Sequence, residues 1–444
     1  MKFITLTAVA SLCLTTVLAG SFPSGNATIT SWGSSQHTIS LNEMKNNINP
    51  PGSAPGFLAA SLCTASPNYY FDWTRDSALS FRVLVNELQN GKSDSTIQSD
   101  LASYIQFVKS SQTANLGEPK FNADGSVFTG PWGRPQNDGP AERASTLILY
   151  DKLNGNSNSK SYVYNDLNYV VSNWQSSCFD LWEENQGQHF FSLMMMRRAL
   201  LDGVTYATNN GDSSEASNYK SVVSNIESLI NTFWTGNYVI VTLGTSAKSN
   251  GLDAAVLLGA NIGGLGDGFY TPGSDKILAT SVVLENAMKS EYPLNSNLPN
   301  WLATAIGRYP GDVYDGVGTS AGNPWFICTN AFAELYYRAI KEWNDAGSVT
   351  VTDISKTFFA QFDSKAASGT VYTAGTDAYN SLVNNIANRA DEFLSTVRYH
   401  QNSNGSISEE FNRENGYMQG AYDLTWSHAS TITAILAKSG NPSI

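Results

Sequence analysis

Two acidic pairs in the sequence lie where a carboxyl group could act as an acid or a base. Glu183 and Glu184 follow Leu181 and Trp182, and a second pair at 409–410 sits in a loop of small residues. The apolar neighbours could exclude water from a carboxyl and favour its protonated form, which a general acid needs. Hydrolysis of a glycosidic bond requires one such acid and a second carboxylate that activates water or attacks the sugar. The two pairs therefore predict a site for glycoside hydrolysis.

Helix capping is the alternative interpretation of both pairs. Asp or Ser three residues before Glu is the spacing of a capping box, so each run could simply start a helix. However, Gly187 follows the first run and the polar segment 412–416 follows the second, so neither leads straight into an apolar helical run. Adjacent residues point in different directions, so Glu183 and Glu184 should have different tasks. We predict that one is the acid and that the other binds substrate.

Three further loops combine aromatic rings with charged side chains that could hold sugar hydroxyls through charge-assisted hydrogen bonds. The candidate binding residues are Tyr69, Trp73, Arg75 and Asp76 in the first loop, Lys120, Trp132, Arg134 and Asp138 in the second, and Arg308, Asp312 and Trp325 in the third. A packed aromatic edge before a helix is the alternative for the first loop. Packing at a helix start is the alternative for Trp325.

The composition favours a neutral ligand. The formal net charge is −12 and the pI is near 4.8, which disfavours a nucleic-acid partner. Charged residues make up 14% of the chain and aromatic residues 11%, a balance that suits a sugar stacked on aromatic faces.

The N-terminal residues have the pattern of an export signal. Lys2 is followed by an apolar stretch and by the small-residue cleavage pattern that ends at Ala19, so residues 1–19 are predicted to be a signal peptide and the protein to be secreted. A membrane anchor is the alternative, but no stretch reaches the roughly 18 apolar residues needed to cross a bilayer. The sequons at Asn26 and Asn404 agree with export and predict glycosylation there.

The remaining cysteines do not form a disulfide framework. Once Cys13 is removed with the signal peptide, Cys63, Cys178 and Cys328 are an odd set, so at most one bridge can exist and buried free thiols are favoured. With four histidines in the chain and no Cys-x-x-Cys, the sequence does not support a metal site.

Helices must position these loops. Apolar residues recur every three or four positions in the segments 74–89, 97–108, 140–153, 161–175, 189–207, 215–233, 276–290, 325–344, 351–362, 377–399 and 424–438, which predicts about a dozen helices. Strand-like alternation is confined to short runs such as 238–242. An inner and an outer ring of helices would bury every apolar stripe in one domain, so we predict an (α/α)6 barrel. A superhelical array of helix pairs is the alternative, but no fixed-period repeat supports it.

The ordered motifs resemble those of a known family. DWTRDS, LGEPKFN, WGRPQNDGPA.RA, DLWEE, GRYP.D, GNPWF, NGS.SE and DLTWS follow one another between about Pro55 and Ala437. In this order they resemble the fungal glucoamylases, glycoside hydrolase family fifteen. The resemblance implies an (α/α)6 barrel with its pocket at one end. It also implies release of β-glucose from the non-reducing ends of starch, maltodextrin or maltooligosaccharides.

Site residues follow from the motifs that match. The resemblance implies Glu183 as general acid, Glu409 as general base, and binding of the terminal glucose by Tyr69, Trp73, Arg75, Asp76 and Arg308. It further implies that Lys120, Trp132 and Arg134 line the first subsites and that Asp180 and Glu184 lie near the acid. We expect residues 20–444 to form a single catalytic domain that acts as a monomer, without a cofactor or a membrane partner.

Three features depart from the family pattern. Phe411 stands where relatives often have a tyrosine that supports the base, and residues 313–322 form a longer loop. The sequence ends at Ile444, soon after the last predicted helix, so we expect no starch-binding domain. An exo-glucosidase with another linkage preference, such as α-1,6 or trehalose, is the alternative enzyme. A carbohydrate-binding protein without catalysis and a purely structural helical protein are the alternatives from other classes.

Overall fold

Six helices form a closed inner ring within the part of the chain that the computed structural model describes, residues 22–92, 94–244, 248 and 250–441. They are α2 (Thr74–Gln89), α4 (Asp138–Asn154), α6 (Phe190–Asn209), α8 (Ala255–Gly263), α10 (Phe326–Ala346) and α13 (Thr425–Lys438). Each packs against the next, and α13 packs against α2 to close the ring. Residues 74–87 of α2 are all buried, as expected for a helix enclosed on every side.

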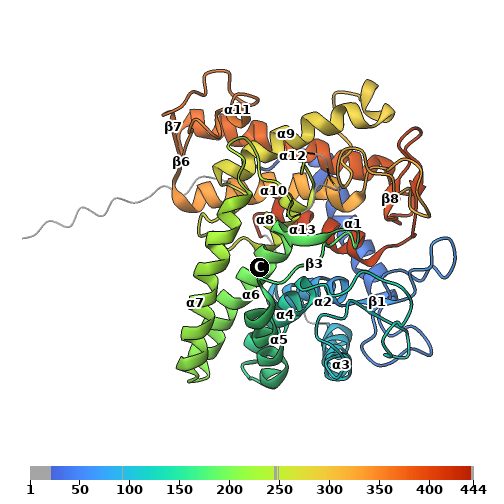
Figure 1. Cartoon of the computed structure of the whole chain (residues 1–444). Helices are drawn as coiled ribbons and strands as arrows, with labels where there is room; N and C mark the ends of the chain where they lie inside the picture. The colour runs from blue at the N-terminus through green and yellow to red at the C-terminus, as the bar shows by residue number, and fades with distance from the viewer. Residues whose placement is uncertain (1–21, 93, 245–247, 249, 442–444) are drawn as a thin grey trace, which may run out of the picture.

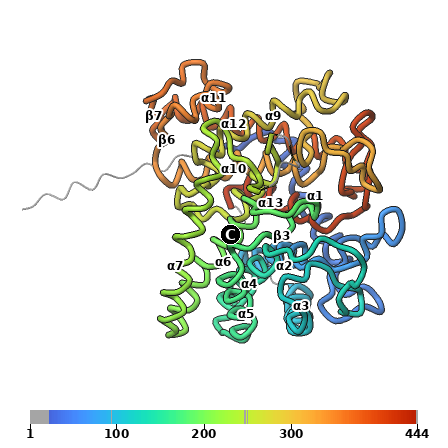
Figure 2. Tube along the Cα trace, in the orientation of Figure 1, coloured from blue at the N-terminus to red at the C-terminus, as the bar shows by residue number. Residues whose placement is uncertain are grey.

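Six outer helices each cover an inner one. They are α1 (Ala27–Asn46), α3 (Ser95–Ser111), α5 (Lys160–Asn173), α7 (Ser213–Ile230), α9 (Asp275–Glu291) and α12 (Asp377–His400). They pack on α13, α2, α4, α6, α8 and α10 respectively, and Figure 1 shows α3, α5 and α7 outside α2, α4 and α6. The predicted (α/α)6 barrel is confirmed. Figure 2 shows how the trace returns to its start, where the blue α1 lies against the red α13.

The helix predictions were most accurate where the apolar period was strong. The predicted 74–89 coincides with α2, and most other predicted segments agree with the observed helices to within three residues at each end. The helix predicted at 351–362 is wrong, because only α11 (Lys356–Phe359) forms there. The strand-like run 238–242 contributes only its last residue to a strand, β5 (Thr242–Leu243).

Two helices, α1 and α8, were missed. The first is rich in Ser and Thr and buries few apolar side chains, whereas the second is apolar all round and has no period to detect. Asn26 starts α1, because its Oδ1 accepts a hydrogen bond from the backbone N–H of Thr28. Gly33 is buried in the same helix, and a Cβ there would contact Ile435 of α13.

Short antiparallel strands tie down the loops at the N-terminal ends of the inner helices. β1 (Asp72–Trp73) pairs with β2 (Lys120–Phe121), β3 (Cys178–Phe179) with β4 (Gln186–His189), and β4 with β5. β8 (Glu410–Phe411) pairs with β9 (Met418–Gln419), and β6 (Ser348–Thr350) with β7 (Val371–Thr373) on the outside. Two short 3-10 turns, η1 (Asn231–Phe233) and η2 (Pro293–Asn297), complete the elements.

The predicted signal peptide, residues 1–19, lies outside the described residues. Across the described part of the chain, no helix combines the length and apolar character that a bilayer crossing demands. The same residues contain no cluster of His, Cys, Asp and Glu suited to a metal ion. Cys63, Cys178 and Cys328 are all buried and free.

Candidate active site

A cavity of about 400 Å³ opens among the loops at the N-terminal ends of the inner helices. Ten of the fifteen predicted catalytic and substrate-binding residues line it: Tyr69, Trp73, Arg75, Asp76, Trp132, Glu183, Glu184, Arg308, Trp325 and Glu409. The two carboxyl groups singled out for catalysis, 226 residues apart in the sequence, therefore face one hollow. The other five predicted residues, Lys120, Arg134, Asp138, Asp180 and Asp312, do not line it. Asp138 is fully buried and pairs with Arg75 at 2.8 Å, so its predicted contact with substrate is corrected.

Glu183 lies in a tight turn between β3 and β4. Its backbone has a φ of 67°, a left-handed conformation that is uncommon for a residue with a side chain, and no helix starts there. The helix-cap alternative is thus excluded for this residue. Oε1 accepts hydrogen bonds from Trp73 Nε1 at 2.7 Å and from Gln136 Nε2 at 2.9 Å. Arg75 Nη2 lies 3.8 Å from the same oxygen, so the residue is held from three sides.

Asp180 supports the turn and does not contact the cavity. Its carboxylate is fully buried and accepts hydrogen bonds from the backbone N–H groups of Glu184 and Asn185 at 2.8 and 3.1 Å. The prediction that Asp180 binds substrate is therefore corrected, because it holds in place the turn that carries the acid. Burial alone would raise the pKa of Asp180, but the Lys248 ammonium and these N–H groups outweigh it and the pKa falls below its usual value.

Lys248 links this turn to the barrel. Its ammonium lies 3.3 Å from Asp180 and 2.6 Å from Asp253, and both carboxylates have no exposed surface. Asp253 in turn accepts a hydrogen bond from the Trp182 indole at 2.9 Å. The single cation therefore pairs with two buried acids that orient the cavity wall.

Lys248→Met should destabilise the fold by about 3–5 kcal/mol, because it leaves two buried carboxylates without a cation. Asp180 has a depressed folded pKa, so its stabilising contribution is present at neutral pH and is lost as the pH falls. The deficit of the variant should therefore be largest near neutral pH and shrink on acidification. Urea denaturation at several pH values measures it.

Lys341→Met is the matched control, because Lys341 pairs with Asp345 at the surface, where the two side chains are 37% and 63% exposed. It should change stability by less than about 1 kcal/mol. A similar small loss in Lys248→Met would contradict the role assigned to the buried cation.

Glu409 is fully enclosed and lies just before β8. Its Oε1 accepts a hydrogen bond from the Tyr69 hydroxyl at 2.8 Å, and its Oε2 accepts one from the Tyr314 hydroxyl at 3.3 Å. No helix starts at Glu409, so the capping alternative is excluded here too. Burial raises the pKa of Glu409 to about 7, while the two hydroxyls oppose the shift.

Glu410 differs sharply from its neighbour. It is fully buried, its Oε2 accepts a hydrogen bond from Asn323 at 2.8 Å, and its side chain does not line the cavity. Burial, together with the charge of Glu409, raises the pKa of Glu410 well above its usual value. We therefore expect Glu409 to carry the negative charge of the pair.

The surroundings of Glu409 explain two departures from the family pattern, Phe411 and the longer 313–322 loop. Phe411 stacks on His400 with ring centroids 4.4 Å apart and packs in a small core, so it does not reach the carboxylate. The 313–322 loop instead brings Tyr314 over Glu409. Hydroxyl support for the candidate base thus comes from Tyr69 and Tyr314.

Tyr69→Phe should move the acidic limb of the pH–activity profile to higher pH by about half to one unit. The hydroxyl stabilises the ionised form of Glu409, so losing it raises the pKa further and the base becomes protonated at a higher pH. Tyr314→Phe should give a smaller shift in the same direction, because its hydroxyl lies farther away. The profile of kcat/KM on maltotriose measures both. A shift toward lower pH in either variant would contradict the assignment.

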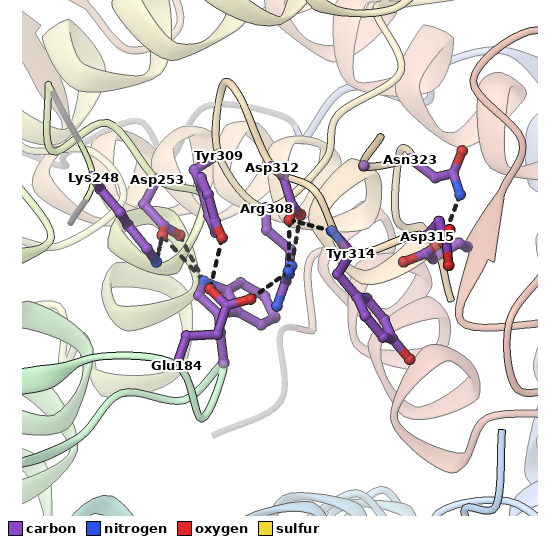
Figure 3. Close-up of polar contacts among 12 residues, drawn as sticks. Glu184, Lys248, Asp253, Arg308, Tyr309, Asp312, Tyr314, Asp315 and Asn323 are labelled. Atoms are coloured by element: carbon purple, nitrogen blue, oxygen red, sulfur yellow. Dashed lines mark hydrogen bonds and ion pairs between the residues drawn. The ribbon is translucent and has the colours of Figure 1, made fainter. Parts of the chain in front are cut away.

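A second charged cluster closes the other side of the cavity (Figure 3). Arg308 lies between Asp312 and Glu184, with hydrogen bonds of 2.7 Å to each. The Tyr309 hydroxyl donates to the second oxygen of Glu184 at 2.6 Å. Asp312 is 3% exposed and does not line the cavity, so its predicted contact with substrate is corrected. It holds Arg308 in place.

Lys120 and Arg134 belong to the loops that carry the cavity wall, but neither lines the cavity. The Lys120 ammonium lies 3.4 Å from the centre of the Trp132 ring and 4.3 Å from that of Trp73, and burial lowers its pKa to about 8. Arg134 binds the carboxylate of Glu118 at 2.8 Å and backbone carbonyls of its own loop. The predicted direct contact of Lys120 is therefore corrected, because this buried ammonium supports the aromatic wall from behind. The Arg134 side chain is 28% exposed, and its contact with substrate stays a prediction.

Several lining residues were missed. Tyr314, Trp426 and Leu424 line the cavity, and Gln136 contacts the acid from outside it. Tyr314, which stands beside Asp315 at the end of GRYPGDVY, and Trp426 in DLTWS were available as signals but were not singled out. Asn26 and Asn404 are exposed, and in each the Oδ1 accepts a local backbone hydrogen bond while Nδ2 has no partner among the described residues.

The geometry suits acid–base chemistry on a neutral, ring-shaped ligand. Two carboxyl groups in different environments face one hollow whose lining includes five tryptophans and two tyrosines, and Arg75, Asp76 and Arg308 supply charged contacts. Asp76 is 8% exposed, and burial raises its pKa to about 6 despite the neighbouring Arg75. Such a pair of carboxyl groups matches the requirement for glycoside hydrolysis.

Known proteins share this architecture and sequence. Residues 38–436 match the family described as glycosyl hydrolases family 15. The chain is 53% identical to glucoamylase 1 of Rhizopus oryzae, over 95% of this chain and 73% of that protein. It is 36% identical to a probable glucoamylase of Schizosaccharomyces pombe, over 93% and 92% of the two chains.

Solved structures of glucoamylases have the same fold as this chain. The glucoamylase of Saccharomycopsis fibuligera superposes with a TM-score of 0.87 at 30% identity, covering 95% of this chain and 97% of that one. The family 15 glucoamylase of Hypocrea jecorina gives a TM-score of 0.86 at 36% identity, covering 94% and 73%.

Proposed function

This chain belongs to glycosyl hydrolase family 15, and we propose that it is a glucoamylase that releases glucose from the non-reducing ends of starch and maltooligosaccharides. The observation that carries the proposal is the single cavity shared by Glu183 and Glu409. Its volume of about 400 Å³ lies within the range of pockets for small molecules and suits the end of a chain.

The proposed reaction is a single displacement. Glu183 protonates the glycosidic oxygen while Glu409 takes a proton from the water that attacks the opposite face of the sugar. The roles follow from the surroundings: Glu183 is 18% exposed with one oxygen free of partners among the described residues, and Glu409 is enclosed beside two hydroxyls. Arg75, Asp76 and Arg308 would bind the terminal glucose, with Trp73, Trp132 and Trp325 stacking on its faces.

Fresh product from maltotriose tests both activity and stereochemistry. Proton NMR within the first minutes should show β-glucose, which later equilibrates with the α-anomer. Initial α-glucose would overturn the single displacement, and no glucose at all would overturn the activity. Initial rates on maltose, isomaltose and trehalose establish the linkage preference, which we expect to favour maltose.

The biological setting is part of the same proposal. We propose that residues 1–19 direct export, that residues 20–444 act as one catalytic domain, and that the mature protein is a secreted monomer. The exposed Asn26 and Asn404 would carry glycans. Mass spectrometry of the exported protein, before and after glycosidase treatment, tests the cleavage site and both sequons.

A further inference from the structure

Gln136 is a buried amide that contacts the acid without lining the cavity. It is 3% exposed and belongs to the loop that leads into α4. Its Oε1 accepts a hydrogen bond from Arg75 Nη1 at 3.0 Å, and its Nε2 donates to the Gly133 carbonyl at 3.1 Å and to Glu183 Oε1 at 2.9 Å. Because arginine can only donate, the amide oxygen must face Arg75 and the NH2 group must face Glu183.

The two oxygens of Glu183 consequently have different surroundings. Oε1 accepts from both Gln136 and the Trp73 indole, so a proton on it would meet two N–H donors. Oε2 has no partner among the described residues, and Glu183 lines the cavity.

We infer that Gln136 is a positioning residue that directs the acidic proton of Glu183 to Oε2, the oxygen available to the substrate. The inference rests on the proposed glucoamylase reaction and deepens it. Oε1 stays an acceptor throughout, and Oε2 gives its proton to the glycosidic oxygen as the bond to the anomeric carbon breaks. After the transfer, the Glu183 carboxylate keeps both N–H donors, which stabilise its new charge.

Gln136→Met tests this without changing a residue that lines the cavity, because methionine keeps the length and removes both the donor and the acceptor, while Arg75 keeps its ion pair with Asp138. On maltotriose, kcat should fall about 10- to 100-fold with KM within about twofold, as expected for the loss of a hydrogen bond to a charged group. On α-D-glucosyl fluoride, whose leaving group needs little protonation, the fall should be less than about threefold.

The pH profile gives an independent readout. The ionised carboxylate of Glu183 loses a donor in Gln136→Met, so the acid should remain protonated to higher pH. The alkaline limb on maltotriose should move upward by about one pH unit. A purely structural defect would slow both substrates alike and leave this limb in place.

Two further variants serve as a control and as a substitute for Gln136→Met. Gln112→Met removes a comparable amide that donates to the Tyr162 carbonyl, away from the site, and should leave both substrates unaffected. Gln136→Glu keeps the shape of the side chain and should show the same selective defect if Gln136→Met does not fold.

Equal losses on both substrates, or an unmoved alkaline limb, would overturn the inference while the proposed function stands. Wild-type protein that releases no glucose from maltotriose would overturn the proposed function itself. Full activity of Gln136→Met on maltotriose would also overturn the inference.

Discussion

Replacing Glu183 with glutamine should lower kcat on maltotriose by about 10²- to 10⁴-fold, the usual contribution of a general acid. The amide keeps the shape of the side chain and can still accept hydrogen bonds from Trp73 and Gln136 through its oxygen. It has no acidic proton to give to the leaving oxygen. Substrate should therefore still bind, and isothermal titration with maltotriose together with steady-state glucose release separates binding from turnover.

The neighbouring Glu184 provides the matched control. Its two oxygens are held by Arg308 and Tyr309, so we expect it to position the sugar and not to transfer a proton. Glu184→Gln should raise KM more than it lowers kcat. Near wild-type kcat in Glu183→Gln, or the same profile in both variants, would show that the acid has been assigned to the wrong residue.

Glu409→Ala should lower kcat by a similar factor, about 10²- to 10⁴-fold, because the proposed reaction relies on Glu409 to take the proton from water. The truncation leaves space beside Tyr69 and Tyr314. Azide can occupy that space and attack α-D-glucosyl fluoride without a base. We therefore expect added azide to restore turnover and to yield β-glucosyl azide, identified by NMR.

Glu410→Gln is the control for this change. Burial raises the pKa of Glu410 well above its usual value and so favours the neutral acid, which glutamine resembles closely. Its activity should stay within about threefold of wild type, since Glu410 does not line the cavity. An α-glucosyl azide from Glu409→Ala would contradict the assigned position of the base relative to the sugar. A severe loss of activity in Glu410→Gln would contradict the choice of Glu409 over Glu410 as the base.

The barrel could be predicted because most helices bury one face. Periodic apolar residues identified α2 and α12 almost residue by residue, whereas α8 is enclosed on all sides and has no polar face to set a period. The N-terminal helix was missed for the opposite reason, since it is rich in Ser and Thr and buries few apolar side chains. Strongly apolar residues at 358 and 359 suggested a long helix where only one turn forms.

The site could be predicted as a set of loops but not as a set of contacts. Ten predicted residues meet in the cavity because their motifs all precede inner helices. Residue type alone cannot tell a carboxylate that faces the cavity from one that holds a turn, which is why Asp180 and Asp312 were expected to touch substrate. Tyr314 and Gln136 were missed because their partners are distant in the sequence.

The pairing of α1 with α13 has a consequence for synthesis. Ser40 and His428 lie 388 residues apart in the chain, yet their side chains are within 3.0 Å. Trp426 and Leu424, which line the cavity, belong to the start of this last inner helix. During translation, α1 is therefore synthesised long before α13, and the two helices can pack together only when synthesis is nearly complete. Until α13 has been made, the ring of inner helices is open and the cavity lacks Leu424 and Trp426, so we expect the nascent chain not to bind sugar.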